Sequence, residues 1–276
     1  MRRESTAVST LRRAYGTSRY GQLHYAAAGP NGTTDKTPVV CFHQSPISGA
    51  QFKLFQRAMA VDRLVLCPDT PGFGGSEGPS RLPQIADYAA AMGDWLDGLK
   101  LGPVDALGFH TGTLVAMELA ILRPELVRRL SLTSLALFSD AERERNRKIF
   151  GNPRPLFDDP DYLGRYYRDQ VSAADPAISE VRRLELFTER MRAGANSWWG
   201  PAAVFAYDTA ERAKLVSQPT LLLVMRDTLA DATRRASALF PRSRVVERLD
   251  WHGPTAWDAK ATEVAGDVSR YFDGAA

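Results

Sequence analysis

One segment constrains the fold more than any other, residues 104–120, which read VDALGFHTGTLVAMELA. An apolar run ends at His110, which is bracketed by Gly108 and Gly112, and an apolar-periodic segment begins immediately after it. This pattern predicts a buried strand, a sharp turn and a helix. Glycine at both flanks lets two backbones pass close together, which a side chain at either position would block.

Three further segments, two before this turn and one after it, also carry recognisable motifs. They are VVCFHQSP at 39–46, DTPGFGGS at 69–76 and LDWHGP at 249–254. Together with the G-x-His-x-G turn, they resemble the α/β-hydrolase family. In that family the corresponding segments are a strand with its oxyanion loop, a D-x-P-G-x-G-x-S loop, the nucleophile elbow and the loop of the catalytic histidine. The chain departs from the family pattern at the elbow, where His110 replaces Ser, Cys or Asp, and in the oxyanion loop, where Gln44 replaces Gly.

Strand-like and helix-like segments alternate along most of the chain. Short apolar runs at 38–43, 63–69 and 103–110 each precede a helical pattern, which predicts βαβ units and a parallel sheet. The resemblance implies the α/β-hydrolase fold, with an eight-stranded, mostly parallel sheet flanked by helices. Residues 138–217 are helix-like and rich in aromatic side chains, and we interpret them as an inserted helical cap on a core of residues 1–137 and 218–276.

The composition limits the partners of the chain. With 276 residues and 44% hydrophobic content, it can bury one large core, and it has no apolar run long enough to span a membrane. The net charge is +3, and the arginines alternate with acids, as in AERERNRK at 141–148, which is typical of a solvated helix face and not of a nucleic-acid site. We expect a small-molecule substrate and leave a homodimer open.

The two cysteines and the N-terminus bear on location and cofactors. Cys41 and Cys67 each lie in an apolar run, which predicts buried free thiols in a reducing compartment. Residues 1–10 contain two arginines but no apolar stretch behind them, which argues against a secretory signal and favours a cytoplasmic location. No Cys/His spacing suggests zinc, so we expect neither a metal nor a cofactor.

The resemblance implies a catalytic set and an oxyanion hole. His252 is the candidate general base, and a carboxylate after the seventh strand would orient it. Asp227 is favoured for that role over Asp231, which suits the first turn of a helix, and over Asp140. The oxyanion hole would use the backbone N–H groups of Thr111 and Gln44.

Five other side chains are candidates for the substrate pocket, each with a structural alternative. His43 could instead hold the oxyanion loop through backbone hydrogen bonds, and Ser45 could stabilise a turn. Trp198, Trp199 and Tyr207 belong to the expected cap, where ordinary packing is the alternative to a substrate cage.

An imidazole at the elbow favours proton transfer over covalent catalysis, since it attacks an acyl carbon poorly. We therefore expect an enzyme that hydrolyses a small ester, thioester or C–C substrate through His110 and His252 without a serine nucleophile. A non-hydrolytic lyase, isomerase or cyclase, and a catalytically silent ligand-binding relative, are the alternatives. Histidine also tolerates a positive φ, so His110 could simply permit the turn.

Overall fold

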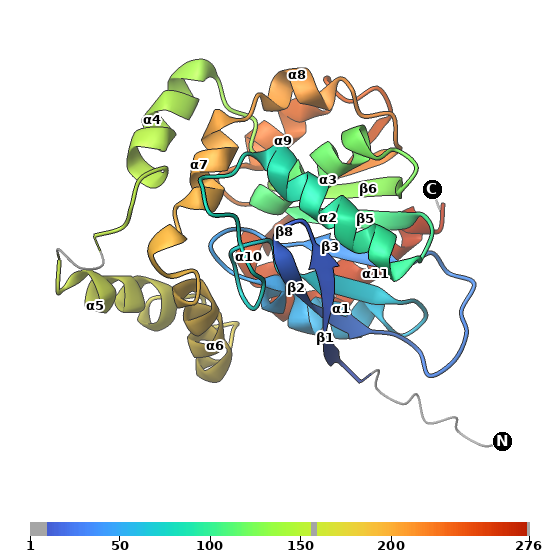
Figure 1. Cartoon of the computed structure of the whole chain (residues 1–276), viewed down its shortest axis with the longest axis horizontal. Coiled ribbons are helices and arrows are strands. Elements are labelled where there is room, and N and C mark those ends of the chain that lie inside the picture. Colours follow the sequence, from blue (N-terminus) through green and yellow to red (C-terminus); the bar gives the residue numbers. More distant parts are fainter. Residues whose placement is uncertain (1–9, 156–158, 275–276) are drawn as a thin grey trace.

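A computed structural model of the chain describes residues 10–155 and 159–274 (Figure 1). Its centre is an eight-stranded sheet with the order β1-β2-β4-β3-β5-β6-β7-β8. The strands are β1 (Arg12–Ser18), β2 (Gly21–Ala28), β3 (Val39–Phe42), β4 (Val65–Pro68), β5 (Val104–Phe109), β6 (Val127–Thr133), β7 (Thr220–Arg226) and β8 (Ser243–His252). Only the pairs β1–β2 and β2–β4 are antiparallel within the described sheet, so the predicted mostly parallel architecture is confirmed.

Helices cover both faces of this sheet (Figure 1). They are η1 (Gly49–Phe52), α1 (Lys53–Met59), α2 (Ile85–Leu99), α3 (Thr111–Leu122), α9 (Ala230–Ala236), α10 (Gly253–Ala259) and α11 (Ala261–Phe272). Helices α2, α3 and α9 contribute to one buried apolar cluster, and α1, α10 and α11 contribute to the other. The segment 1–9, on which the interpretation of the N-terminus rests, lies outside the described residues.

Strand β3 shows how the sequence builds the two layers. Its four residues are fully buried, yet Val40 and Phe42 join one apolar cluster while Val39 and Cys41 join the other. Successive side chains of a strand point to opposite faces, so a strand covered on both sides must be apolar throughout. The same burial makes Cys41 and Cys67 the buried free thiols that the sequence predicts, and it raises the pKa of Cys67.

A helical cap is inserted between β6 and β7 and lies to one side of the sheet layers in Figure 1. It comprises α4 (Asp140–Phe150), α5 (Tyr162–Tyr167), η2 (Arg168–Ser172), α6 (Glu180–Met191), η3 (Gly194–Asn196), α7 (Trp199–Ala206) and α8 (Thr209–Ala213). Several cap helices begin as their sequence dictates: Ser139 caps α4 in a capping box, and Ser179 caps α6. None of the described helices is both long and apolar enough to cross a membrane.

Candidate active site

The elbow residue His110 connects β5 to α3 in a backbone conformation that most residues avoid, with φ at 54° and ψ at −121°. The flanking glycines are required by close backbone contacts. A Cβ atom on Gly112 would lie 1.9 Å from the carbonyl oxygen of Phe42, and one on Gly108 would lie 2.5 Å from the carbonyl oxygen of Gly112. The predicted strand, turn and helix are therefore observed, and the turn is held by contacts that exclude any side chain at its flanks.

His110 opens into a cavity of about 580 Å³ between the sheet and the cap. The core contributes Ser45, His110 and Thr111 to its wall. The cap contributes apolar and aromatic side chains from α4, α5 and α7 and the loop before α4, among them Phe138, Phe150, Tyr166, Val204 and Phe205. A cavity of this volume with mixed apolar and polar walls is typical of a small-molecule site.

Burial is the main influence on the titration of His110. It lowers the pKa of the imidazole below its ordinary value, and the positive charge of Arg190 lowers it further, while the carboxylate of Asp227 acts in the opposite direction. The ring is therefore neutral at pH 7, and a neutral imidazole can accept a proton. The geometry agrees, since His110 and Arg190 line the same cavity, and Asp227 bonds to Ser134, whose neighbour Thr133 accepts a 3.2 Å hydrogen bond from the backbone N–H of His110.

Of the three candidate acids, Asp227 is the one near the elbow. Its carboxylate accepts a hydrogen bond from the Ser134 hydroxyl and another, 2.8 Å long, from the backbone N–H of Leu229. Asp231 lies in the first turn of α9, as its alternative interpretation predicts, and its exposed side chain pairs with Arg234. Asp140 is exposed at the start of α4.

His252 lies outside the cavity. The segment 249–254, which the resemblance assigns to a loop, instead begins in strand β8, whose last residue is His252, with a register shift opposite Arg226. The side chain of Trp251 is buried, and that of His252 is exposed, because neighbours in a strand face opposite sides. His252 is therefore not among the residues that line the cavity with His110, and the hydrogen bonds of the Asp227 carboxylate go to Ser134 and Leu229.

The oxyanion loop differs from the expectation at Gln44. The backbone N–H of Gln44 donates a 3.1 Å hydrogen bond to the side-chain carbonyl of Gln51, so this predicted donor is already engaged. Thr111 is the first residue of α3, where backbone N–H groups have no partner within the helix, and it lines the cavity. Ser45 also lines the cavity, and its buried hydroxyl has no hydrogen-bond partner among the described atoms.

His43 performs the structural role given as its alternative. Nδ1 lies 2.8 Å from the carbonyl oxygen of Gln44, and Nε2 accepts a 2.8 Å hydrogen bond from the backbone N–H of Thr70. Burial lowers the pKa of His43, in keeping with a neutral ring that donates through one nitrogen and accepts through the other. His43 thus fixes the oxyanion loop from behind and does not line the cavity.

The three other pocket candidates also lie outside the cavity lining. Trp198 and Trp199 pack edge to face against each other, with ring centroids 6.5 Å apart. The hydroxyl of Tyr207 donates a 2.5 Å hydrogen bond to Glu118 of α3, which also pairs with Arg212. These three side chains therefore pack within the cap or attach it to the core.

Among the cavity residues that the sequence interpretation missed are three arginines, Arg145, Arg154 and Arg190. Arg145 lies in the mixed-charge segment 141–148, whose charge pattern predicts a solvated helix face. That assignment holds for its neighbours, since Arg147 and Lys148 pair with Glu144 on the surface. No local pattern distinguishes one arginine of such a helix from another. These residues can be identified only once the positions of α4 and α6 over the elbow are known.

Comparison with known proteins identifies the family. Residues 37–212 match the model of the alpha/beta hydrolase fold family, so the chain belongs to it. Among curated relatives it is similar to haloalkane dehalogenase 2 of Mycobacterium bovis, with 24% identity over 80% of this chain and 71% of that protein. It is also similar to 2-hydroxymuconate semialdehyde hydrolase of Pseudomonas sp. strain CF600, with 38% identity over 41% of this chain and 39% of that protein. A thermophilic esterase from Thermogutta terrifontis has a similar structure, with a TM-score of 0.76 and 19% identity over 95% of this chain and 98% of that one.

Proposed function

We propose that this chain is a hydrolase of a small carbonyl compound, in which His110 transfers the protons and no serine nucleophile takes part. The observation that carries the proposal is the position of His110, a neutral imidazole held at the elbow and facing a cavity of about 580 Å³. A group that must accept a proton at neutral pH needs a pKa at or below that pH, and burial supplies this condition. Family membership and relatives with hydrolytic names support the hydrolytic class.

The proposed reaction begins with a water molecule between His110 and the substrate carbonyl. The imidazole accepts a proton as the water oxygen bonds to the carbonyl carbon, and the carbonyl oxygen becomes an oxyanion. The Thr111 N–H and the Ser45 hydroxyl donate hydrogen bonds to that oxyanion. The intermediate then collapses, the bond to the leaving group breaks, and the imidazolium returns its proton to that group.

Asp227 contributes to this scheme through its charge. Its carboxylate raises the pKa of His110, which means that it stabilises the imidazolium formed during the reaction. His252 has no assigned step, because its exposed ring lies outside the cavity. We also propose a cytoplasmic location, which the two buried free thiols support.

One observation favours a non-hydrolytic proton-transfer enzyme as the second candidate. The backbone N–H of Gln44 donates its hydrogen bond to the side chain of Gln51, so fewer hydrogen-bond donors are left for the concentrated charge of a tetrahedral oxyanion. An enolate spreads its charge over more atoms and depends less on a complete hole.

The test of the proposed function combines a substrate panel with a serine-directed fluorophosphonate probe. We expect turnover of at least one ester, thioester or 1,3-diketone by the wild-type protein, without labelling by the probe. Labelling that abolishes turnover would contradict the absence of a serine nucleophile. Isomerisation or elimination of the panel compounds without hydrolysis would favour the second candidate, and no turnover of any compound would favour a ligand-binding protein.

A further inference from the structure

Three guanidinium groups line the cavity above the elbow. Arg145 comes from α4, Arg154 from the loop after it and Arg190 from α6. None of the three makes a hydrogen bond or an ion pair with any part of the chain that the structure describes. Arg154 and Arg190 are partly buried, so bulk water does not fully solvate their side chains.

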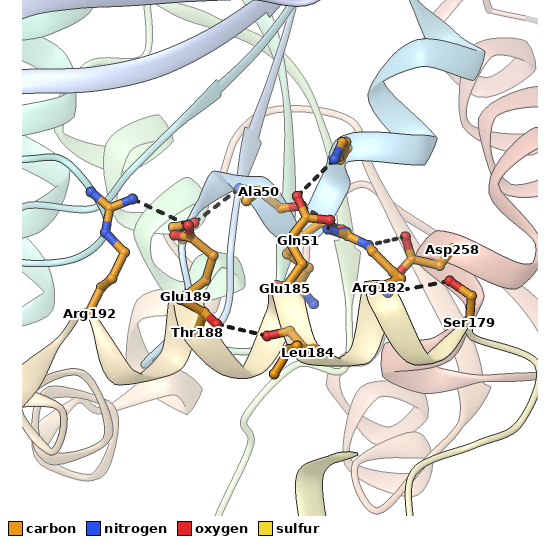
Figure 2. A network of polar contacts seen from close by, with 12 residues as sticks. Ala50, Gln51, Ser179, Arg182, Leu184, Glu185, Thr188, Glu189, Arg192 and Asp258 are labelled. Atoms are coloured by element: carbon orange, nitrogen blue, oxygen red, sulfur yellow. Dashed lines mark hydrogen bonds and ion pairs between the residues drawn. The ribbon is translucent and has the colours of Figure 1, made fainter. Parts of the chain in front are cut away.

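Pairing is the usual state of arginines in this cap. Arg147 bonds to Glu144, and Arg165 bonds to Asp159. On α6 and at its C-terminal cap, Figure 2 shows Arg182 bonded to Asp258 and Arg192 bonded to Glu189, so Arg190 differs from these two arginines. The cavity therefore concentrates unpaired positive charge although acids are abundant nearby.

The negative charge available inside the described cavity wall is already engaged. Glu142 is the carboxylate among the lining residues, and it accepts hydrogen bonds of 2.8 Å from both the backbone N–H and the hydroxyl of Ser139. This capping box holds the carboxylate at the start of α4. The three cations outnumber Glu142 together with Asp227, the carboxylate near the elbow, so the cavity keeps a net positive charge.

We infer that the cavity binds a small organic anion, with its carboxylate or phosphonate group on Arg145, Arg154 and Arg190 and its apolar body against the aromatic wall. Guanidinium groups match the paired oxygens of these anions and form the stronger class of hydrogen bonds. Phe138, Phe150 and Phe205 supply the apolar surface. This inference rests on the proposed function, because it names the class of substrate that the cavity favours, a small molecule with both an anionic group and a reacting carbonyl.

The position of Arg190 sets where that anionic group lies. Arg190 and His110 line the same cavity, so an anion bound at Arg190 shares that cavity with the elbow. A small molecule that carries both the anionic group and the reacting carbonyl can span the two within one cavity of about 580 Å³.

Direct binding tests the inference without any chemical step. The probes are 4-phenylbutyrate, 3-phenylpropylphosphonate and the neutral amide 4-phenylbutanamide, measured by isothermal titration calorimetry against the wild-type protein at low and high salt. We expect at least one anion to bind about tenfold more tightly than the amide and to weaken as salt increases. The two anions distinguish a carboxylate site from a phosphonate site.

Variants locate the binding. Arg190→Gln and Arg154→Gln should each weaken the better anion by about tenfold, while Arg168→Gln, an exposed cap residue outside the cavity, should leave its affinity unchanged. Circular dichroism melting checks that each variant is folded. If a variant does not fold, the comparison of anion with amide still tests the inference, because it uses only the wild-type protein. Equal affinity for anion and amide, no binding of any probe, or equal loss in Arg168→Gln would overturn the inference. Because binding is measured without turnover, its failure is distinct from a failure to hydrolyse the ester panel.

Discussion

At the scale of single residues, the elbow combines a strained backbone with a side chain that is unusual for the family. The carbonyl of Phe42 overlaps the place that a Cβ atom on Gly112 would take. Packing therefore requires glycine at this position, independent of the chemistry at His110. The sequence therefore predicts the turn from its glycines alone. The role of His110 depends on the cavity and on Arg190, which no local pattern contains.

The close contact at Gly112 predicts a large loss of stability in Gly112→Ala. The new methyl group would overlap the Phe42 carbonyl oxygen, which lies 1.9 Å from the Cβ position, and we expect the free energy of unfolding to fall by about 3 kcal/mol or more. Gly98→Ala is the matched control. Its Cβ meets nothing within 4 Å and Gly98 is exposed in α2, so alanine should stabilise the helix by about 0.5–1 kcal/mol. Urea unfolding of both variants measures the difference, and similar effects in the two would contradict this account of the turn.

Arg190 also predicts a change in pH dependence. Its charge lowers the pKa of His110, so Arg190→Gln should raise that pKa. A base that is active when neutral loses activity as pH falls through its pKa, and the acidic limb of the pH–rate profile should therefore move to higher pH in the variant. Rates measured with a neutral ester isolate this effect from substrate binding, with Arg168→Gln as the control. A limb that stays in place, or moves to lower pH, would show that His110 does not control the rate.

At the scale of secondary-structure elements, α6 attaches the cap to the core through one buried guanidinium. Arg182 bonds to Asp258 of α10 at 3.0 Å and to the carbonyl oxygens of Ala50 and Gln51 at 2.8 and 3.1 Å (Figure 2). Gln51 in turn holds the N–H of Gln44. A continuous set of hydrogen bonds thus runs from a cap helix to the loop beside the elbow.

This anchor predicts that Arg182→Gln destabilises the protein strongly. The side chains of Arg182 and Asp258 are 8% and 5% exposed, and removing one partner leaves a buried carboxylate, which costs about 3–5 kcal/mol. Arg192→Gln breaks only a more exposed contact with Glu189 and should cost about 1 kcal/mol or less. Thermal and urea unfolding compare the two variants. Equal, small losses would mean that Arg182 does not hold α6 on the core.

The elements themselves were largely predictable. The sequence predicts the strands at 38–43, 63–69 and 103–110 within a few residues, because a strand covered on both faces is a short, uninterrupted apolar run. It fails at the end of β8, which extends to His252. Alternation along that strand buries Trp251 and turns His252 outward, and this depends on the register with β7, which local composition does not determine.

At the scale of the whole molecule, four ordered motifs are sufficient for the fold, because they fix which strand ends meet at one edge of the sheet. The cap is also predictable as a helical insertion between β6 and β7. The side chains of the cap that face the cavity are not predictable from the sequence. Trp198, Trp199 and Tyr207 pack away from the cavity, whereas Arg154 and Arg190 face it. Those positions follow from contacts between distant segments, which a single sequence does not reveal.

Chemical rescue tests most directly whether His110 transfers protons. On the best ester of the panel, we predict that His110→Ala and His110→Ser both lose about 10²–10⁴-fold in kcat, since neither side chain replaces an imidazole as acid or base. Added imidazole should restore activity to His110→Ala in proportion to its concentration of neutral base, while His252→Ala, altered outside the cavity, keeps a rate near that of the wild type. Equal rates in the wild type and both His110 variants would contradict the account, as would esterase activity and fluorophosphonate labelling that appear in His110→Ser at the wild-type rate.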